Sequence, residues 1–201
     1  NGGTIFDQVS DYRRSDGSSY QELSYQNQTS DNESTGWEVQ LDYQQPVGAS
    51  SKIEGGYKGN FNHQNSPTET FSDEDRSQTI ELLFNRFIYD SNVHAVYLNW
   101  QSRIAEKFGY QLGLRGEGWN IDTESYDYNA EYNNGKPEAF KKDYFKVFPT
   151  MFLSYQVSET QELQLNYTRR LRRPWGGQLN SFKNISDSTN ISYGNPQLTP
   201  E

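Results

Sequence analysis

The 201-residue sequence contains no cysteine and only two histidines, His63 and His94. The absence of cysteine excludes disulfides and every metal or redox site built on thiolates. The two histidines lack the paired spacing of a metal site, and neither a Gly-x-Ser-x-Gly elbow nor a phosphate-binding glycine loop occurs. We therefore expect a protein that is not an enzyme and has no catalytic residue, metal or cofactor.

Long apolar runs and an excess of basic residues are missing as well. No run approaches the ~18 apolar residues of a transmembrane helix, and the first residues, NGGTIFDQVS, show no signal peptide. Acidic residues number 27 against 18 basic ones, so the formal net charge is −9. Nucleic acid is therefore not an expected partner, because binding to phosphates needs a broad positive surface.

Aromatic residues, in contrast, are plentiful. The chain holds 15 Tyr, 11 Phe and 4 Trp, although only 32% of its residues are hydrophobic and its mean hydropathy is −1.02. A disordered chain is poor in aromatics, and a compact soluble domain contains more aliphatic residues. This composition favours strands that are apolar on one face only.

Apolar and polar residues alternate with a period of two along most of the chain, which is typical of strands. In STGWEVQLDYQQ, the apolar residues from Trp37 to Tyr43 fall on one face and the polar residues between them on the other. The stretch TIELLFNRFIY (79–89) is spaced for a helical turn. We predict eight strands, at 4–13, 19–28, 36–45, 52–62, 92–103, 108–121, 144–157 and 162–172. Most of them match the ~9–11 residues that a tilted strand needs to cross a bilayer.

The connections between these strands alternate between short and long. The stretches 63–91, 122–143 and the one from Arg173 onward are long, and short connections stand between them. Short periplasmic turns and longer extracellular loops are typical of an up-and-down transmembrane barrel, whereas Greek-key connections would break this order. We therefore predict an all-β fold, the antiparallel wall of a transmembrane β-barrel. A soluble sheet stays open as an alternative, since any antiparallel sheet can alternate in this way.

Aromatic residues near the strand ends are predicted to form the interfacial girdles of such a barrel. In a soluble sheet the same residues would form the core. His94 shares the parity of Leu98 and Trp100, so we expect it on the same face rather than in a metal site. The girdle residues are Trp37, Tyr43, Trp100, Phe108, Trp119, Phe145 and Tyr155.

Two stretches near the C-terminus, FPTMFLSYQVSETQELQLNYTRRLRRPWGGQLNSF and YGNPQLTPE, carry a set of short motifs. With them, the chain resembles the barrel of TonB-dependent outer-membrane receptors of the type common in Bacteroidetes. LDYQQP and GLRGE extend the resemblance to about residues 37–201. Ser181 departs from the pattern, because the family usually has a proline there. The matching residues are Phe148, Pro149, Thr150, Leu153, Ser154, Tyr155, Tyr167, Thr168, Arg169, Arg170, Arg173, Pro174, Leu179, Asn180, Phe182, Gly194, Asn195, Pro196, Leu198, Pro200 and Glu201.

The resemblance implies a barrel of about 22 strands closed around an N-terminal plug. The chain would then be a partial barrel domain over residues 1–201, with the plug, the TonB-contacting segment and any signal peptide outside it. It would lie in the outer membrane of a Gram-negative bacterium and help to import a scarce ligand, such as a metal chelate, vitamin or glycan. Its expected partners are outer-membrane lipid, lipopolysaccharide, the plug, TonB and that small ligand.

Two alternatives from other classes stay open. One is a small closed outer-membrane barrel with a structural or adhesive role. The other is a soluble, carbohydrate-binding β-sandwich. The sequence leaves the identity of any imported ligand undecided.

The four arginines of YTRRLRRP are predicted to mark the extracellular end of the last strand. Strand parity sends Arg170 and Arg172 to the lumen, and Arg169 and Arg173 to the outer face. A guanidinium at the bilayer midplane would cost roughly 2–4 kcal/mol, so the outer pair should lie near the headgroups, where lipopolysaccharide phosphates can pair with it. Pairing with acidic loop residues such as Asp187 stays open.

Tyrosines and carboxylates share the proposed loop at 122–132. Tyr126, Tyr128 and Tyr132 are candidate ligand-facing residues, because their rings can stack on sugars. The acidic runs at 72–76 and 122–132 could hold Ca²⁺ through several oxygens. A solvated charged loop is the alternative interpretation.

Overall fold

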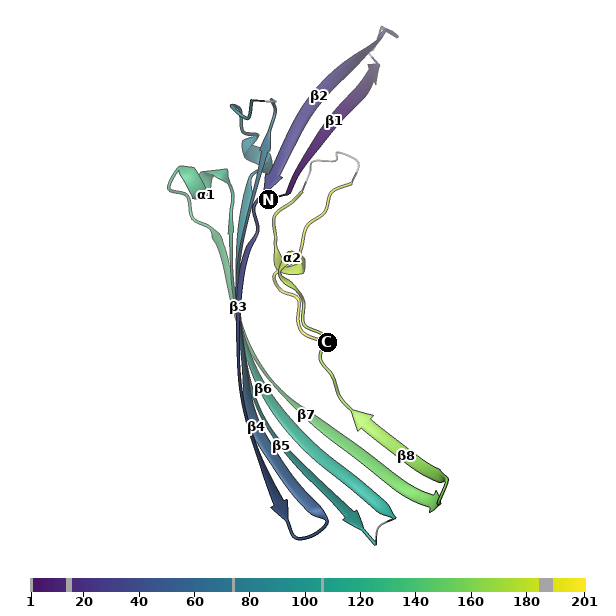
Figure 1. The fold of residues 1–201 in the computed structure, drawn as a ribbon. Coiled ribbons are helices and arrows are strands. Elements are labelled where there is room, and N and C mark those ends of the chain that lie inside the picture. The colour runs from purple at the N-terminus through teal and green to yellow at the C-terminus, as the bar shows by residue number, and fades with distance from the viewer. Residues whose placement is uncertain (1, 14–15, 74, 106, 185–189) are drawn as a thin grey trace.

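One antiparallel sheet of eight strands makes up most of the chain (Figure 1). The computed structural model describes the chain except for residues 1, 14–15, 74, 106 and 185–189, and in β1 and β2 it describes only the backbone of residues 2–13 and 19–25. The predicted all-β antiparallel fold is confirmed. The strands are β1 (Gly2–Arg13), β2 (Ser19–Ser30), β3 (Glu33–Val47), β4 (Ser51–Phe71), β5 (Asn85–Ile104), β6 (Phe108–Tyr126), β7 (Glu138–Ser158) and β8 (Gln161–Thr168).

Helical structure in the described part of the chain is limited to three short elements. They are the 3-10 turn η1 (Glu81–Leu83) and the helices α1 (Tyr128–Tyr132) and α2 (Gly176–Leu179). The turn η1 lies inside the stretch 79–89, where the sequence predicted a helical turn. Short connections follow β3, β5 and β7 at one end of the sheet, which we call the turn end. The connections with η1 and α1 lie at the opposite end, the loop end (Figure 1).

The central strands are longer than predicted. β4, β5, β6 and β7 contain 21, 20, 19 and 21 residues, so much of the predicted loops at 63–91 and 122–143 is strand. The last strand is instead shorter than predicted, because β8 ends at Thr168 and not at residue 172.

The first two strands form where they are predicted but pair differently from the others. β1 pairs with β2 along its whole length, but β2 pairs with β4 only through residues 27–30, at the loop end. β3 then continues along the same edge of β4, with Asp31 and Asn32 as the only residues between β2 and β3. The predicted strands at 4–13 and 19–28 are therefore confirmed as β1 and β2, but the hairpin that they form extends the loop end and does not run beside the full length of β4 (Figure 1).

Large apolar side chains are exposed on one face of the sheet, here called the outer face. Strand register places them side by side: Leu41 opposite Tyr57, Leu98 opposite Leu114. In β3 this apolar band runs from Trp37 to Val47, which at ~3.4 Å per residue is about 34 Å of strand. At a tilt of ~40° its height is about 26 Å, close to the apolar belt of membrane barrels. Its exposed members include Trp37, Leu41, Tyr43, Val96, Leu98, Leu114, Phe145, Leu163 and Leu165.

The opposite, inner face carries the main hydrophobic cluster, but only near the loop end. Phe87, Val93, Trp119 and Ile121 are buried there against Leu179 of α2. Below them, toward the turn end, the inner face is polar. On the outer face the order is reversed, because the apolar band gives way to polar residues toward the loop end.

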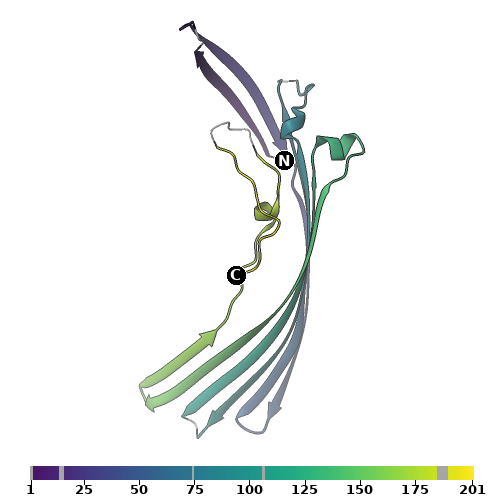
Figure 2. The ribbon, with the colours of Figure 1, turned by 180° about the vertical axis from the view of Figure 1, so that it is seen from behind.

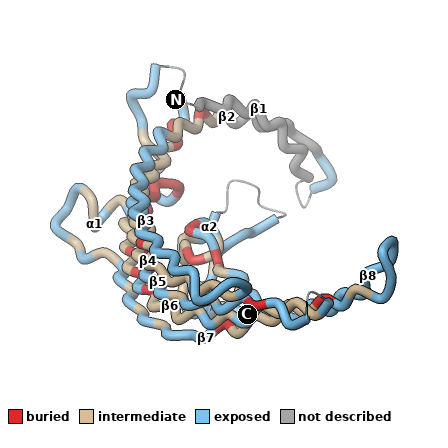
Figure 3. The backbone as a smooth tube through the Cα atoms, turned by 60° about the horizontal axis from the view of Figure 1, so that its bottom comes forward, coloured by how far each residue is buried: buried red, intermediate tan, exposed pale blue. Residues whose placement is uncertain are grey.

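Residues 169–184 and 190–201, here called the C-terminal segment, lie against this inner face (Figures 1 and 2). The segment folds back on itself, since backbone hydrogen bonds join Arg172 to Glu201 and Asn180 to Gly194. The sheet curves around it as an open arc (Figure 3). In the apolar band the edges of the arc are β3 and β8, each of which pairs on one side only within the described chain.

Candidate functional site: the inner face and the loop end

A carboxylate on β6 holds the start of the C-terminal segment. Glu117 is 12% exposed, and its Oε1 accepts a hydrogen bond from Arg115 Nε at 2.5 Å. Its Oε2 accepts a hydrogen bond from Arg173 Nη2. The Arg173 guanidinium also lies 5.7 Å from the centre of the Trp119 ring, a distance at which a cation is attracted to the ring.

Trp119 extends this contact into the hydrophobic cluster. Its Nε1 donates to Ser91 Oγ at 2.7 Å, and its ring stacks on Tyr144 at 5.3 Å. The Tyr144 hydroxyl in turn donates to the backbone oxygen of Leu198 at 3.2 Å, in the returning half of the segment. The prediction that Trp119 belongs to the outer girdle is wrong, because its odd position on β6 faces inward and the ring is only 2% exposed.

Asn180 fixes the middle of the C-terminal segment. Its Nδ2 donates to Asn85 Oδ1 on β5 at 2.8 Å, and its Oδ1 accepts from the backbone of Phe182 at 3.1 Å. Its backbone oxygen accepts from the Gly194 nitrogen at 2.7 Å. A Cβ on Gly194 would lie 2.6 Å from the backbone oxygens of Asn180 and Gln178. Only glycine therefore fits where the two halves of the segment meet.

The serine that departs from the family motif has its own contact. Ser181 Oγ donates to Glu138 Oε2 at 2.6 Å, at the start of β7. A proline there would lack this hydrogen bond to the wall.

The structure brings several family-motif residues together, although they are distant in sequence. Arg173, Leu179, Asn180, Gly194 and Asn195 all lie in the C-terminal segment, and each is held by the wall or by the other half of the segment. Glu201 pairs through its backbone with Arg172, next to Arg173. The other motif residues of the segment are Pro174, which is buried, and Pro196 and Pro200, which are half-buried.

The motif residues of β7 are divided between the two faces. Phe148 faces inward and is 7% exposed. Pro149 and Tyr155 point outward, opposite Leu114 and Phe108 of β6.

Two of the arginines lie on a different side from the one predicted. Arg169 and Arg173 line a hollow on the inner face together with Arg115 and Arg170. The strand ends at Thr168, so the parity that sent Arg169 and Arg173 outward does not extend to them. Asp187, the suggested partner, lies outside the described residues. Glu117 itself was missed, although its charge and its odd position on β6 are the pattern of an inward-facing residue.

Polar contacts continue along the inner face below the C-terminal segment. Lys58 Nζ lies 2.8 Å from Glu38 Oε1, across the β3–β4 pair. The Tyr97 hydroxyl donates to Asp42 Oδ1. This face thus presents charges and hydrogen-bonding groups, whereas the apolar band occupies the other face of the same strands.

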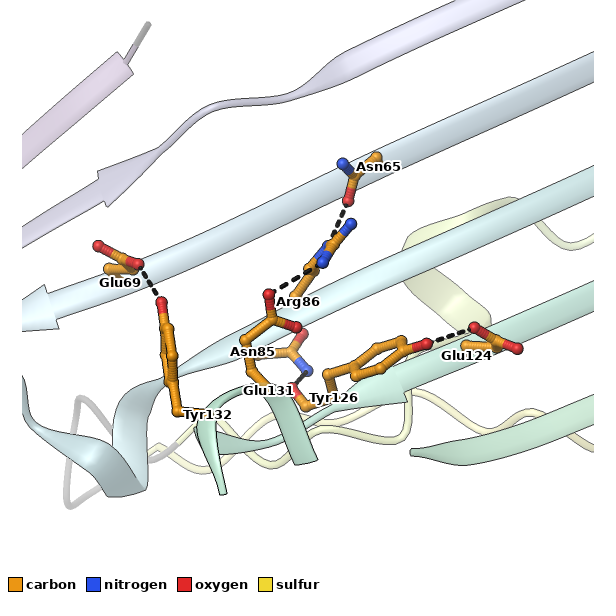
Figure 4. Close-up of polar contacts among 8 residues, drawn as sticks. All are labelled: Asn65, Glu69, Asn85, Arg86, Glu124, Tyr126, Glu131 and Tyr132. Carbon is orange, nitrogen blue, oxygen red and sulfur yellow. Dashed lines mark hydrogen bonds and ion pairs between the residues drawn. The ribbon is translucent and has the colours of Figure 1, made fainter. Parts of the chain in front are cut away.

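Two of the candidate tyrosines of the loop end, Tyr126 and Tyr132, lie on the outer side of the wall (Figure 4). Arg86, on the outer face of β5, binds Glu131 at 2.9 Å and Asn65 at 3.0 Å, which holds α1 against the strands. The Tyr132 hydroxyl donates to Glu69 at 3.0 Å. Burial and this hydrogen bond raise the pKa of Tyr132 to about 12.

The rings of this tyrosine group pack on one another. Tyr128 and Tyr132 lie 4.8 Å apart, and both meet the edge of the buried Phe84. The Tyr126 hydroxyl donates to Glu124 at 2.7 Å (Figure 4). A ligand-facing role for the three tyrosines stays a prediction, and a ligand would reach them from outside the lumen.

Acidic residues do not gather into a metal site in the described part of the chain, where no group of three or more potential ligands meets. In the run at 72–76, Asp73 accepts hydrogen bonds from Ser77 and Gln78 within its own turn. No described helix is long and apolar enough to cross a membrane.

A comparison with protein families decides what this sheet is. The outer membrane protein beta-barrel family matches residues 5–201. The chain belongs to this family. No curated protein matches the sequence. As an outer-membrane β-barrel protein it lies in the cell outer membrane, so its apolar band faces lipid and its polar inner face lines the lumen. The soluble sandwich is thereby excluded, and His94 lies exposed on the lipid side, with its Nδ1 2.8 Å from the Tyr57 hydroxyl.

Proposed function

We propose that the chain is part of the barrel wall of a TonB-dependent receptor, which imports a scarce ligand such as a metal chelate, a vitamin or a glycan. The plug, TonB and lipopolysaccharide would be its partners. The observation that carries the proposal is the C-terminal segment folded against the inner face. Such a segment needs an interior that is wider than side chains alone would fill.

The width argument separates a receptor from a small barrel. An eight-stranded barrel encloses just enough space for its own inward side chains. Here the inner face also accommodates a doubled backbone, because residues 172–180 run back beside 194–201. The edges β3 and β8 stay apart in the open arc, so further strands have room to pair with both of them. A small closed barrel would have to expel the segment before its edges could meet.

The inner face and the loop end suit a transporter in other respects. Charged and hydrogen-bonding groups line the lumenal side of the band, where a polar solute would pass. The strands extend beyond the apolar band at the loop end, which is the extracellular end in membrane barrels. α1 and the β1–β2 hairpin therefore project into the medium, where a scarce ligand is first met.

Deletion of the parent gene tests this function directly. We expect accumulation of one compound from a panel of labelled iron chelates, cobalamin and oligosaccharides to be lost in the deletion strain. The same loss should follow in the wild type when the proton gradient of the inner membrane is collapsed, because TonB-coupled import depends on it. Restoring the gene on a plasmid provides the control.

The size of the native protein provides a second readout. An outer-membrane band several times heavier than 23.3 kDa, detected with an antibody to this segment, would support the receptor. A native product near 23.3 kDa, with unchanged uptake of the whole panel, would refute the proposal and favour a small barrel with an adhesive or structural role.

A further inference from the structure

A hollow of about 310 Å³ on the inner face, here called the arginine hollow, lies where β8 ends. Four arginines line it, namely Arg115, Arg169, Arg170 and Arg173, and Glu117 is the only carboxylate among its described lining residues. The hydroxyls of Thr150 and Thr168, which face each other across the β7–β8 pair, also line it. Phe148 and Leu171 supply its apolar part. The whole molecule carries a net charge of −9, so this concentration of positive charge is local.

The arginines are not neutralised by their surroundings. Glu117 already binds both Arg115 and Arg173. Arg169 and Arg170 are exposed, and neither has an ion-pair partner among the described residues. The Nε of Arg173 is buried and donates to no acceptor in the described part of the chain. The hollow therefore has an excess of about three positive charges and at least one unused buried donor.

A bound anion would compensate the excess positive charge and accept a hydrogen bond from the unused donor. Guanidinium groups bind carboxylates and phosphates through pairs of parallel hydrogen bonds, and threonine hydroxyls donate further ones. Arg115 and Arg173 are half-buried in the hollow, which the buried Phe148 also lines, so water screens their charges less than those of the exposed Arg169 and Arg170. A neutral ligand would leave the arginines uncompensated, and a cation would be repelled.

We propose that the arginine hollow binds an anionic group, a carboxylate or a phosphate, of the ligand that the barrel imports. The inference rests on the proposed function as a receptor and adds the chemical class of the ligand. The position suits this role, because Thr150 and Thr168 lie on the inner face at the level of Asn99 and Gly113, within the height of the apolar band. Arg115 and Glu117 lie between that level and Gly118 on β6, so an anionic ligand that enters from the loop end would meet this charge in the outer half of the membrane.

The test uses the full-length parent protein, purified in detergent, with inorganic phosphate and citrate as probes and glucose as the neutral comparison. Phosphorus NMR line broadening and calorimetry measure binding. We expect binding of phosphate or citrate, and none of glucose, and the better of the two anions identifies the preferred group. Replacing Arg169→Gln or Arg170→Gln should raise the Kd at least about tenfold, the loss of one charge-assisted contact.

Arg103→Gln provides a matched control, because Arg103 is also exposed but lies at the turn end of β5. It should leave the Kd unchanged. Equal anion binding by the double variant of Arg169 and Arg170 and by the wild type would overturn the inference. Anion binding that appears only after deletion of the plug would overturn it too, because the plug's own carboxylates would then be the occupant.

The failure of this inference is distinguishable from failure of the receptor function. If import is coupled to the proton gradient but the two substitutions do not change anion binding, the receptor function is supported and the anion site is refuted. If import is absent but anion binding depends on Arg169 and Arg170, the site stands without the transport function.

Discussion

An arginine placed at Leu98 should reveal which face of the sheet meets lipid. Leu98 is 57% exposed on the outer face, between Gly55 and Leu114 in register, near the middle of the apolar band. An arginine on the lipid side costs roughly 2–4 kcal/mol at the bilayer midplane. Leu98→Arg should therefore lower the ratio of folded to unfolded protein roughly 30- to 1,000-fold.

Two control substitutions on the same strand separate the effect of the face of the sheet from the effect of depth in the membrane. Asn99 is the next residue and points to the polar inner face, beside Lys58 and Tyr97. Asn99→Arg should cost less than about 1 kcal/mol, as a change on the lumenal side. Ile88 shares the outer face with Leu98 but lies toward the loop end, opposite Glu124. Ile88→Arg should also cost about 0–1 kcal/mol, because it lies above the hydrocarbon.

The assay is a urea titration of the full-length protein in lipid vesicles, with folding followed by the gel mobility of the unheated barrel. The expected order of destabilisation is Leu98→Arg far above Asn99→Arg and Ile88→Arg. Equal shifts for Leu98→Arg and Asn99→Arg would show that the outer face is not in contact with lipid. A larger cost at Ile88 than at Leu98 would contradict the position that we assign to the membrane along the strands.

Three further changes test the C-terminal segment and the loop end. Gly194→Ala should loosen the segment, because its Cβ would lie 2.6 Å from two backbone oxygens. Limited proteolysis should then cut the segment faster, whereas Gly118→Ala, whose nearest neighbour is 4.0 Å away, should not change cleavage. Glu117→Gln removes the shared partner of two arginines and should cost roughly 1–3 kcal/mol, seen as faster hydrogen exchange in the segment; unchanged exchange would contradict this role. The pKa of Tyr132 is raised from 10.0 to about 12, so its contact with Glu69 is fully stabilising below about pH 10 and is lost as the pH rises toward 12. The absorbance of the phenolate should show that this late titration disappears in Tyr132→Phe and moves to lower pH in Glu69→Gln. A titration that does not move in Glu69→Gln would refute the role of Glu69 in raising the pKa.

The strands of the apolar band were predictable because one physical requirement determines them. Each strand must be apolar toward lipid and polar toward the lumen, so residues such as Trp37 and Leu41 alternate with polar ones. The predicted strands at 36–45, 52–62, 92–103 and 108–121 accordingly lie within β3 to β6. The extensions beyond the band lack this requirement, so the sequence around Asp90 predicts a loop although the structure has a strand there.

The site was less predictable, because its contacts join residues far apart in the sequence. Arg173 and Glu117 are separated by 56 positions, and Asn180 and Asn85 by 95. The motif that contains Arg173 and Asn180 marked them as important without giving their partners. Parity also failed for Arg169 and Arg173, since it holds only while the chain remains a strand, and β8 ends at Thr168. Trp119 was misplaced because an aromatic residue near a strand end suits a girdle as well as an inner core.

The change of polarity along the strands locates the membrane surface without reference to any ligand. On the outer face of β5, Asp90 lies toward the loop end and Val96 toward the turn end, so the switch occurs near His94 between them. His94 pairs with Gly118 on β6, and Gly118 pairs with Phe145 on β7, where the same face turns apolar. Three neighbouring strands thus change character at one level of the sheet. Unrelated changes of polarity on single strands would not fall at the same level. The boundary between hydrocarbon and headgroups, in contrast, places the change at one level on every strand that crosses it. The inner face changes in the opposite sense at about this level, because beyond the boundary its apolar residues meet the C-terminal segment and below it they would meet the water-filled lumen.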